Sequence, residues 1–214
     1  MSKITALRIG KGQRNRVNTF LDNRFFCKLE KDVVLKEGLQ VGQELTPSQI
    51  EALTKSNDFY SCFNAAIHYL GYRPRSEFEI KERLLRRGFG NETVESVIVK
   101  LKEQGLVDDV AFAQFWRENR DSFSPRSQWL TKLELRQKRV NDDVIDQVIE
   151  TSNDEDSAYR AALTKARSLP RSDYQSFRQR LGEFLKRRGF DYRTINHAIE
   201  RLWSEGGLEP NSPP

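Results

Sequence analysis

The segment Pro74-Arg75-Ser76 returns 51 residues later as Pro125-Arg126-Ser127, and the residues that follow keep the same register. Leu84 is matched by Leu135 at this interval and by Leu185 at an interval of 101 residues. A period of about 50 residues, with apolar positions kept in register, indicates one supersecondary unit used three times. Stacked units of this kind present a long surface and seldom enclose a pocket.

From residue 59 onward the apolar spacing predicts helices, three to each unit. Ser76 and Glu79 form a capping box that starts the middle helix of the first unit, and Gly88 ends that helix. The remaining helices are predicted to begin at a polar N-cap: Asp58, Asn91, Asp108 or Asp109, Ser124 or Ser127, Asn141, Asn153, Asp173 and Asp191. We therefore expect a mainly α protein whose three tandem three-helix repeats form an elongated curved array.

The N-terminal part of the chain has a different pattern, which predicts strands. Ile4–Ile9 has the composition of a short strand. Val17–Leu21 and Phe25–Leu29 are β-prone segments around Asp22-Asn23, a pair that tolerates the positive φ angles of a tight turn. The sequence therefore predicts a small β-hairpin module ahead of the repeats.

Further signals complete the expected organisation. Gly38 and Gly42 flank one more predicted short strand, and Thr46-Pro47 begins a helix that is expected to run through Leu53. The chain is thereby divided into five segments: 1–57, the β module with a short helix; 58–107, 108–152 and 153–205, the three-helix repeats 1, 2 and 3; and 206–214, a disordered tail.

The net charge of +5 is unevenly spread along the chain. Residues 1–58 carry ten Lys/Arg against seven Asp/Glu, residues 109–155 carry seven against ten, and residues 156–214 carry eleven against seven. Basic ends suit a polyanion, whereas an acidic middle suits a basic protein surface.

Cysteine content and hydropathy predict the compartment. Cys27 and Cys62 do not make a disulfide framework, and we interpret each as a small buried hydrophobic residue. No secretory signal and no segment of membrane-spanning length is found in the sequence. We expect a cytoplasmic protein without a membrane partner.

Catalytic motifs are absent from the sequence, including both glycine-rich phosphate-binding loops. His68 and His197 each fall inside a predicted helix without a second ligand at metal-binding spacing, so we interpret them as surface or boundary residues. Glu79 and Lys81 have the Glu-x-Lys spacing of metal-dependent nucleases, but no partner carboxylate on a strand accompanies them. The sequence predicts a protein that is not an enzyme and uses no cofactor or metal, with a nuclease as the least favoured alternative.

Basic residues gather at the turn after the middle helix of every unit and around its start. The predicted contact residues for phosphates or for an acidic protein groove are Arg73, Arg75, Arg86, Arg87, Arg126, Lys132, Lys138, Arg139, Arg187 and Arg188. Cations also favour helix C-termini because the helix dipole is negative there, so a single pair needs no ligand. Repetition favours a ligand, since stacked units would place three such turns along one face, where they could follow phosphates or an acidic groove.

Four aromatic residues lie at core spacing in the second unit. They are Phe112, Phe115, Trp116 and Trp129. We expect all four in the core rather than in a base-stacking role.

Several short motifs occur in a fixed order: Ala65–Leu70, Arg73-Pro74-Arg75-Ser76-Glu77, Ile80–Phe89, Val97–Leu101, and Gly105-Leu106-Val107-Asp108-Asp109 with Phe112-Ala113. Together they resemble the RecX family, whose members regulate the recombinase RecA. The resemblance covers about residues 59–203, and the last motif is the most specific. One departure is Lys138-Arg139-Val140, where the family usually has glycine in the middle, so this helix end is less settled.

The resemblance implies regulation without catalysis. Family members bind RecA and its filament on single-stranded DNA, lie in the filament's helical groove, and depress ATP hydrolysis, strand exchange and co-protease activity in recombination and the SOS response; some also bind DNA directly. The implied partners of this chain are RecA and the RecA–single-stranded DNA filament, with direct DNA contact as a further possibility, and the implied state is a monomer. A RecA-independent DNA-binding module and a scaffold for another protein stay open as alternatives, as do the direction of the effect on RecA and the role of the β module.

Overall fold

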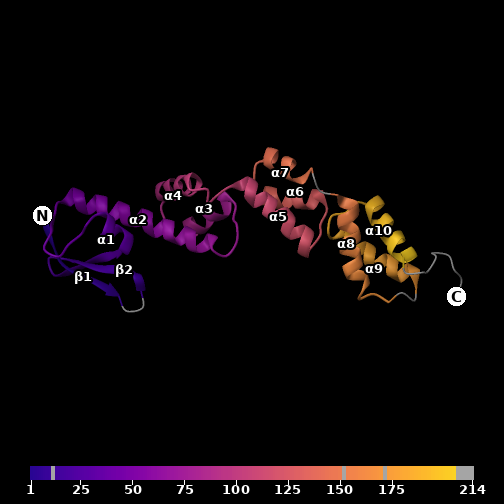
Figure 1. The fold of residues 1–214 in the computed structure, drawn as a ribbon, viewed down its shortest axis with the longest axis horizontal. Coiled ribbons are helices and arrows are strands. Elements are labelled where there is room, and N and C mark those ends of the chain that lie inside the picture. Colours follow the sequence, from indigo (N-terminus) through magenta and orange to yellow (C-terminus); the bar gives the residue numbers. More distant parts are fainter. Residues whose placement is uncertain (11–12, 151–152, 171–172, 206–214) are drawn as a thin grey trace. The chain divides into compact units, whose positions relative to one another are not determined.

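The computed structural model describes residues 1–10, 13–150, 153–170 and 173–205, and the predicted tail lies outside these ranges. The described residues form four strands and ten helices, divided between two compact units, residues 1–107 and 108–214 (Figure 1). The predicted mainly α fold, with three-helix repeats behind a small β module, is confirmed. The five-segment division of the chain stays a prediction.

The β module is a four-stranded antiparallel sheet in the order β3-β2-β1-β4. Its strands are β1 (Ser2–Gly10), β2 (Gln13–Leu21), β3 (Arg24–Glu30) and β4 (Glu44–Leu45). Asp22 and Asn23 have φ angles of 48° and 61° at the turn between β2 and β3, which confirms the predicted hairpin. The core of the module contains Ile4, Leu29 and Leu53, so it is shared between the sheet and the long helix that begins at Pro47.

The segment after the hairpin corrects one prediction. No strand lies between Gly38 and Gly42; instead the short helix α1 (Lys31–Lys36) precedes them and the two-residue β4 follows. Both glycines adopt positive φ, 60° and 95°, so the chain turns at each of them. These turns place Leu39 in the module's core instead of in a strand.

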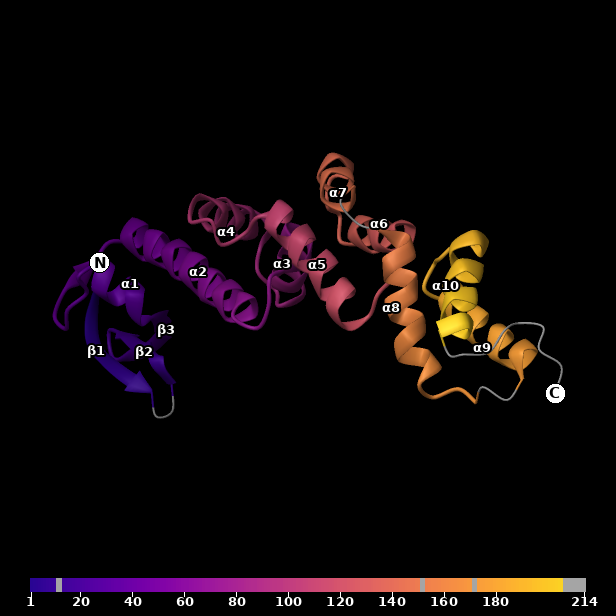
Figure 2. The same cartoon turned by 45° about the vertical axis from the view of Figure 1, so that its right-hand side comes forward.

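Helix α2 (Pro47–Leu70) corrects a second prediction, because it continues past Leu53 and through Asp58 without a break. Thr46 caps its N-terminus, as predicted, and the side chain of Gln49 completes a capping box there. The polar stretch in its middle is a contact surface: Asn57 Oδ1 accepts a hydrogen bond from the Glu30 backbone N–H at 2.8 Å, and Asn64 Nδ2 donates to Glu30 Oε2 at 3.1 Å. Figure 2 shows α2 running from the sheet to the next two helices of the first unit.

Repeat 1 is completed by α3 (Glu77–Arg86) and α4 (Asn91–Glu103). The capping box of Ser76 and Glu79 is confirmed, and Gly88 ends α3 with a φ of 89°. Asn91 is the first helical residue of α4 and not its cap; Gly90 holds the N-cap position without a side-chain hydrogen bond.

The second unit contains repeats 2 and 3. Its helices are α5 (Asp109–Phe123), α6 (Gln128–Gln137), α7 (Asp142–Ile149), α8 (Asp154–Ala166), α9 (Tyr174–Lys186) and α10 (Tyr192–Glu205). The N-caps are Asp108, Ser127, Asn141, Asn153 and Asp173, so the alternatives Asp109 and Ser124 were wrong. Asp191 accepts a hydrogen bond from the Thr194 N–H at 2.8 Å at the start of α10.

Each repeat has its own apolar core. Leu84, Leu135 and Leu185, the three residues matched by the repeat register, are all at most 1% exposed. Phe112 is also buried and Trp116 packs against it, as predicted. Trp129 is 64% exposed, so the prediction of a core position was wrong. It lies in the first turn of α6, and its ring borders Gly189 on the surface between repeats 2 and 3.

Candidate polyanion-binding site

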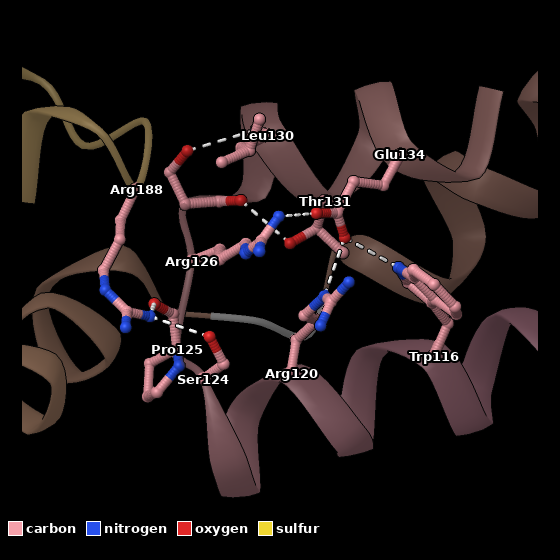
Figure 3. Close-up of polar contacts among 10 residues, drawn as sticks. Trp116, Arg120, Ser124, Pro125, Arg126, Leu130, Thr131, Glu134 and Arg188 are labelled. Atoms are coloured by element: carbon pink, nitrogen blue, oxygen red, sulfur yellow. Dashed lines mark hydrogen bonds and ion pairs between the residues drawn. The ribbon is translucent and has the colours of Figure 1, made fainter. Parts of the chain in front are cut away.

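The loop between α5 and α6 brings three arginines and one glutamate together where repeats 2 and 3 meet. We call this group, Arg120, Arg126, Glu134 and Arg188, the arginine corner (Figure 3). Arg120 comes from the last turn of α5, Arg126 from the residue before the α6 cap, Glu134 from α6, and Arg188 from the turn after α9.

Glu134 is the centre of the arginine corner, with a side chain only 11% exposed. Its Oε2 accepts hydrogen bonds from Trp116 Nε1 and Arg120 Nε, each at 2.8 Å, and its Oε1 accepts from Arg126. One carboxylate therefore fixes two guanidinium groups and an indole, which orients them before any ligand arrives.

Arg188 ties repeat 3 to repeat 2. Its guanidinium donates to Ser124 Oγ and to the Pro125 carbonyl, both at 2.9 Å, and stacks at 4.4 Å on the ring of Phe184. Its own carbonyl accepts from the Ser127 N–H at 3.0 Å. The side chain and the backbone of the same residue thus hold the two repeats in one register.

The arginine corner has more positive than negative charge. Burial lowers the pKa of all three guanidinium groups, and Arg120 lowers the pKa of Arg126 and Arg188 further by repulsion. Asp121, which lines an adjoining cavity with Arg188, is paired with Arg160 at 3.6 Å. A bound anion would relieve this repulsion.

A cavity of about 360 Å³ opens beside the arginine corner. It is lined by Ser124, Arg126, Phe184, Arg187 and Arg188. Planar guanidinium groups bind phosphate and carboxylate oxygens in pairs, so the cavity has the donors for an acidic group of a polyanion. Three of the ten predicted contact residues, Arg126, Arg187 and Arg188, are brought together here.

The four predicted contact residues of repeat 1 have other neighbours. Arg73 forms an ion pair with the buried Glu79 at 3.0 Å, and Arg75 stacks at 4.1 Å on a tyrosine ring. Arg86 pairs with a glutamate at 2.5 Å on the exposed side of α3, and Arg87 is exposed at the end of this helix.

The remaining three predicted contact residues lie on repeat 2, outside the lining of this cavity. Lys132 pairs with Asp146 at 2.6 Å, linking α6 to α7. Lys138 lies 5.5 Å above the Trp116 ring, and Arg139 is exposed with a positive φ of 57°. The alignment of the three basic turns along one face stays a prediction.

Two members of the arginine corner, Arg120 and Glu134, were not predicted from the sequence. Arg120 lies in an amphipathic helix, and Glu134 belongs to the acidic middle of the chain. One signal could have found them: the repeat register matches Arg120 to Tyr69 and Glu134 to Arg83, so both positions change chemical type between repeats.

The residues considered for catalysis are engaged in structural contacts. Glu79 serves the capping box and pairs with Arg73, and Lys81 bridges Glu77 and Glu95.

Burial raises the pKa of the Cys27 and Cys62 thiols to about 11. Within the described ranges, no three His, Cys, Asp or Glu side chains come close enough to hold a metal ion.

A membrane-spanning helix would need a long apolar stretch, and among the residues with described structure none of the helices has one.

Three family models match the chain. The regulatory protein RecX N-terminal domain matches residues 2–46, the first RecX three-helix domain matches residues 62–110, and the third RecX three-helix domain matches residues 153–199. These matches fall on the β module, on repeat 1 and on repeat 3.

Relatives and solved structures agree with the family models. The chain is 35% identical over 146 residues to the regulatory protein RecX of Prosthecochloris aestuarii, covering 68% of this chain and 96% of the relative. It is 29% identical over 216 residues to that of Clostridium perfringens strain 13, covering 98% and 100%. A crystal structure of regulatory protein RecX shares the fold with a TM-score of 0.64 at 22% identity, covering 96% of this chain and all of that chain. RecX from Lactobacillus salivarius gives a TM-score of 0.57 at 22% identity, covering 69% and 97%. The motifs, the repeats and these relatives together show that the chain belongs to the RecX family of regulatory proteins.

Proposed function

We propose that this protein binds RecA and its filament on single-stranded DNA and lowers RecA's ATP hydrolysis, strand exchange and co-protease activity. Membership in the RecX family is the observation that supports this proposal. The proposal also includes the prediction that the protein acts without catalysis of its own. In this proposal the protein acts as a monomer in the cytoplasm.

The arginine corner supports a contact with an acidic partner. Its positive charge exceeds what Glu134 neutralises, and the cavity beside it is lined by Arg126, Arg187 and Arg188. Acidic side chains of the filament or phosphates of its DNA are the groups that such a cavity would bind, and binding through them weakens as salt rises.

The proposal is tested by titrating this protein into RecA on single-stranded DNA and measuring ATP hydrolysis. We expect hydrolysis to fall as the protein approaches the amount of RecA. Unchanged hydrolysis at an excess of folded protein would contradict the proposal.

Charge variants locate the contact. Arg187 and Arg87 are exposed at helix ends, so replacing both by alanine should weaken inhibition without unfolding the protein. The double variant Arg24→Ala and Lys31→Ala removes the same charge from exposed positions of the β module and serves as the control. Equal loss in both variants would show that net charge, and not the helix ends, determines binding.

A RecA-independent DNA-binding function is favoured by one observation, the excess of arginine over glutamate at the arginine corner. A gel shift with single-stranded DNA and no RecA, at low and at high salt, separates the two functions. Tight binding that falls steeply with salt would favour direct DNA binding; its absence, with RecA inhibition kept, would favour the filament.

A further inference from the structure

Repeat 3 has a groove between α9 and α10 with a volume of about 640 Å³. Its apolar lining includes Gly182, Ile195, Ile199 and Phe190. The polar residues along it are Gln175, Arg178, Gln179, Glu183, Lys186, Tyr192 and Asn196. The lining residues on α9 run from Gln175 to Lys186, so the groove follows about 17 Å of this helix.

Repeats 1 and 2 carry an ion pair at the matching place. Lys81 of α3 reaches Glu95 of α4 at 2.8 Å, and Lys132 of α6 reaches Asp146 of α7 at 2.6 Å. Each pair spans from the second helix of the repeat to the third. Both lysine side chains are less than a third exposed, and we infer that their apolar stems lie over the surface between the two helices.

The repeat register places Gly182 and Asn196 at these positions of repeat 3. The covering lysine is therefore replaced by a residue without a side chain, and the carboxylate by a neutral amide. Repeat 3 therefore lacks the lysine and its ion pair but keeps the apolar surface beneath them, since Ile195 and Ile199 match Val94 and Ile98.

Packing does not require glycine at position 182. A Cβ added there would meet Ile195 Cγ2 and Ile199 Cδ1 at 3.9 Å, which is ordinary van der Waals contact. Gly182 is not among the residues with positive φ, and glycine inside a helix is less stable than alanine. Glycine at position 182 therefore makes α9 less stable, but it leaves the apolar surface of the groove open. A residue that lowers stability while exposing such a surface is the pattern expected of a functional position.

The charges along the groove favour an acidic occupant. Arg178 and Lys186 lie on the α9 side with one acidic neighbour, Glu183. Arg178 is held toward α10 by hydrogen bonds to Tyr192 Oη at 3.2 Å and Asn196 Oδ1 at 3.4 Å. Repeat 3 as a whole also carries more Lys and Arg than Asp and Glu.

We propose that this groove binds an acidic amphipathic helix of a protein partner, with the apolar face of that helix on Gly182, Ile195 and Ile199. A cleft between two helices accepts a third helix through ridges and grooves, and a glycine lets the two backbones approach closely. Arg178 and Lys186 then pair with acidic residues that flank the apolar face. This surface and its ligand are additional to the proposed function and do not depend on RecA.

A displayed library of random peptides about 16 residues long, enough to cover the groove as a helix, is selected on the full-length protein. We expect enriched peptides with apolar residues three and four positions apart and an excess of Asp and Glu. No enrichment above the blank surface, or enrichment of basic peptides, would overturn the proposal.

The site is tested with the double variant Gly182→Lys and Asn196→Asp, which rebuilds the ion pair of repeats 1 and 2 and leaves the net charge unchanged. The selected peptides should bind it at least about tenfold more weakly by fluorescence anisotropy. Lys81→Ala, which removes the matching lysine of repeat 1, is the control and should bind them as the unaltered protein does. Equal affinity for the double variant and the unaltered protein would overturn the assignment, provided that the melting temperature shows the variant to be folded.

Two single variants test the floor and the basic flank of the groove separately. Gly182→Ala adds one methyl group on the floor and should weaken peptide binding while raising the melting temperature. Arg178→Gln should reduce the salt dependence of binding, and an unchanged salt dependence would show that the acidic flanks bind elsewhere. Since RecA and DNA are absent from these assays, a failure here leaves the proposed function to its own test.

Discussion

Repeats 1 and 2 build the same corner from three matched positions, but they hold their arginines by different chemistry. In repeat 1 the guanidinium groups of Arg75 and Arg83 lie 4.1 and 5.7 Å from the ring centre of Tyr69. At the matched positions, repeat 2 has Arg126, Glu134 and Arg120 in this order. A ring holds cations without neutralising them, whereas the Glu134 carboxylate neutralises one charge and accepts hydrogen bonds from two guanidinium groups and an indole. The corner of repeat 2 therefore confines more charged groups than that of repeat 1 and should tolerate substitution less well.

Removing the carboxylate gives the largest expected effect. Glu134→Gln leaves Arg120 and Arg126 partly buried without a counter-charge, and we expect the free energy of unfolding to fall by about 3 kcal/mol in urea titration. The exposed pair Glu82–Arg86 of repeat 1 supplies the control, since Glu82→Gln should change stability by less than about 0.5 kcal/mol. Similar losses in the two variants would show that burial does not distinguish these ion pairs.

The glycine turns of repeats 1 and 3 give the next effect. Gly189 has a φ of 84°, and a Cβ there would meet Ser127 Oγ at 2.6 Å and Leu130 Cβ at 2.8 Å. Gly88 has a φ of 89° with nothing within 4 Å of the added atom. Gly189→Ala should lower the free energy of unfolding by about 2 kcal/mol through strain and overlap, and Gly88→Ala by about 1 kcal/mol through strain alone. The reverse order in thermal or urea unfolding would contradict the close contact between repeats 2 and 3.

Substitution of Tyr69, the ring that holds the arginines of repeat 1, should lower the free energy of unfolding less than substitution of Glu134 in the arginine corner. Tyr69→Leu keeps apolar bulk but removes the ring face under Arg75 and Arg83, so we expect a loss of about 1 kcal/mol. Tyr72, which is 72% exposed, provides a control whose replacement by leucine should leave stability nearly unchanged. A loss at Tyr69 as large as that of Glu134→Gln would mean that the two corners are energetically alike.

The smallest effect is a gain. Arg139 adopts a φ of 57° after α6, where the matched residue of repeat 3 is Gly189. Arg139→Gly should raise the free energy of unfolding by about 0.5–1 kcal/mol, because glycine takes this conformation without strain. Lys138→Gly, at a φ of −85° one residue earlier, should not stabilise the protein. A loss at Arg139 would show that its side-chain contacts outweigh the strain.

The repeats could be predicted because their determinants are local. Ser76, Ser127 and Asn141 cap helices through hydrogen bonds to residues two or three positions away, so spacing in the sequence reveals them. Trp129 shows the limit of periodicity. It has the apolar character of a core residue, yet the first turn of α6 places it on the surface.

The contacts between elements could not be predicted in the same way. The polar residues in the middle of α2 resembled a break between helices, but Asn57 and Asn64 bind Glu30, which is distant in sequence. The arginine corner also depends on contacts such as that between Arg188 and Ser124, 64 residues apart. Arg126 could be singled out from the sequence as a candidate contact residue, and that role stays a prediction; its carboxylate partner becomes evident only once α5 and α6 are packed together.

The unbroken course of α2 has a mechanical consequence. This single helix packs at its N-terminal end in the β module and at its C-terminal end in repeat 1, and Glu30 is hydrogen-bonded to its middle. A force applied to the sheet would therefore be transmitted through α2 to repeat 1, because the helix has no break at which it could bend.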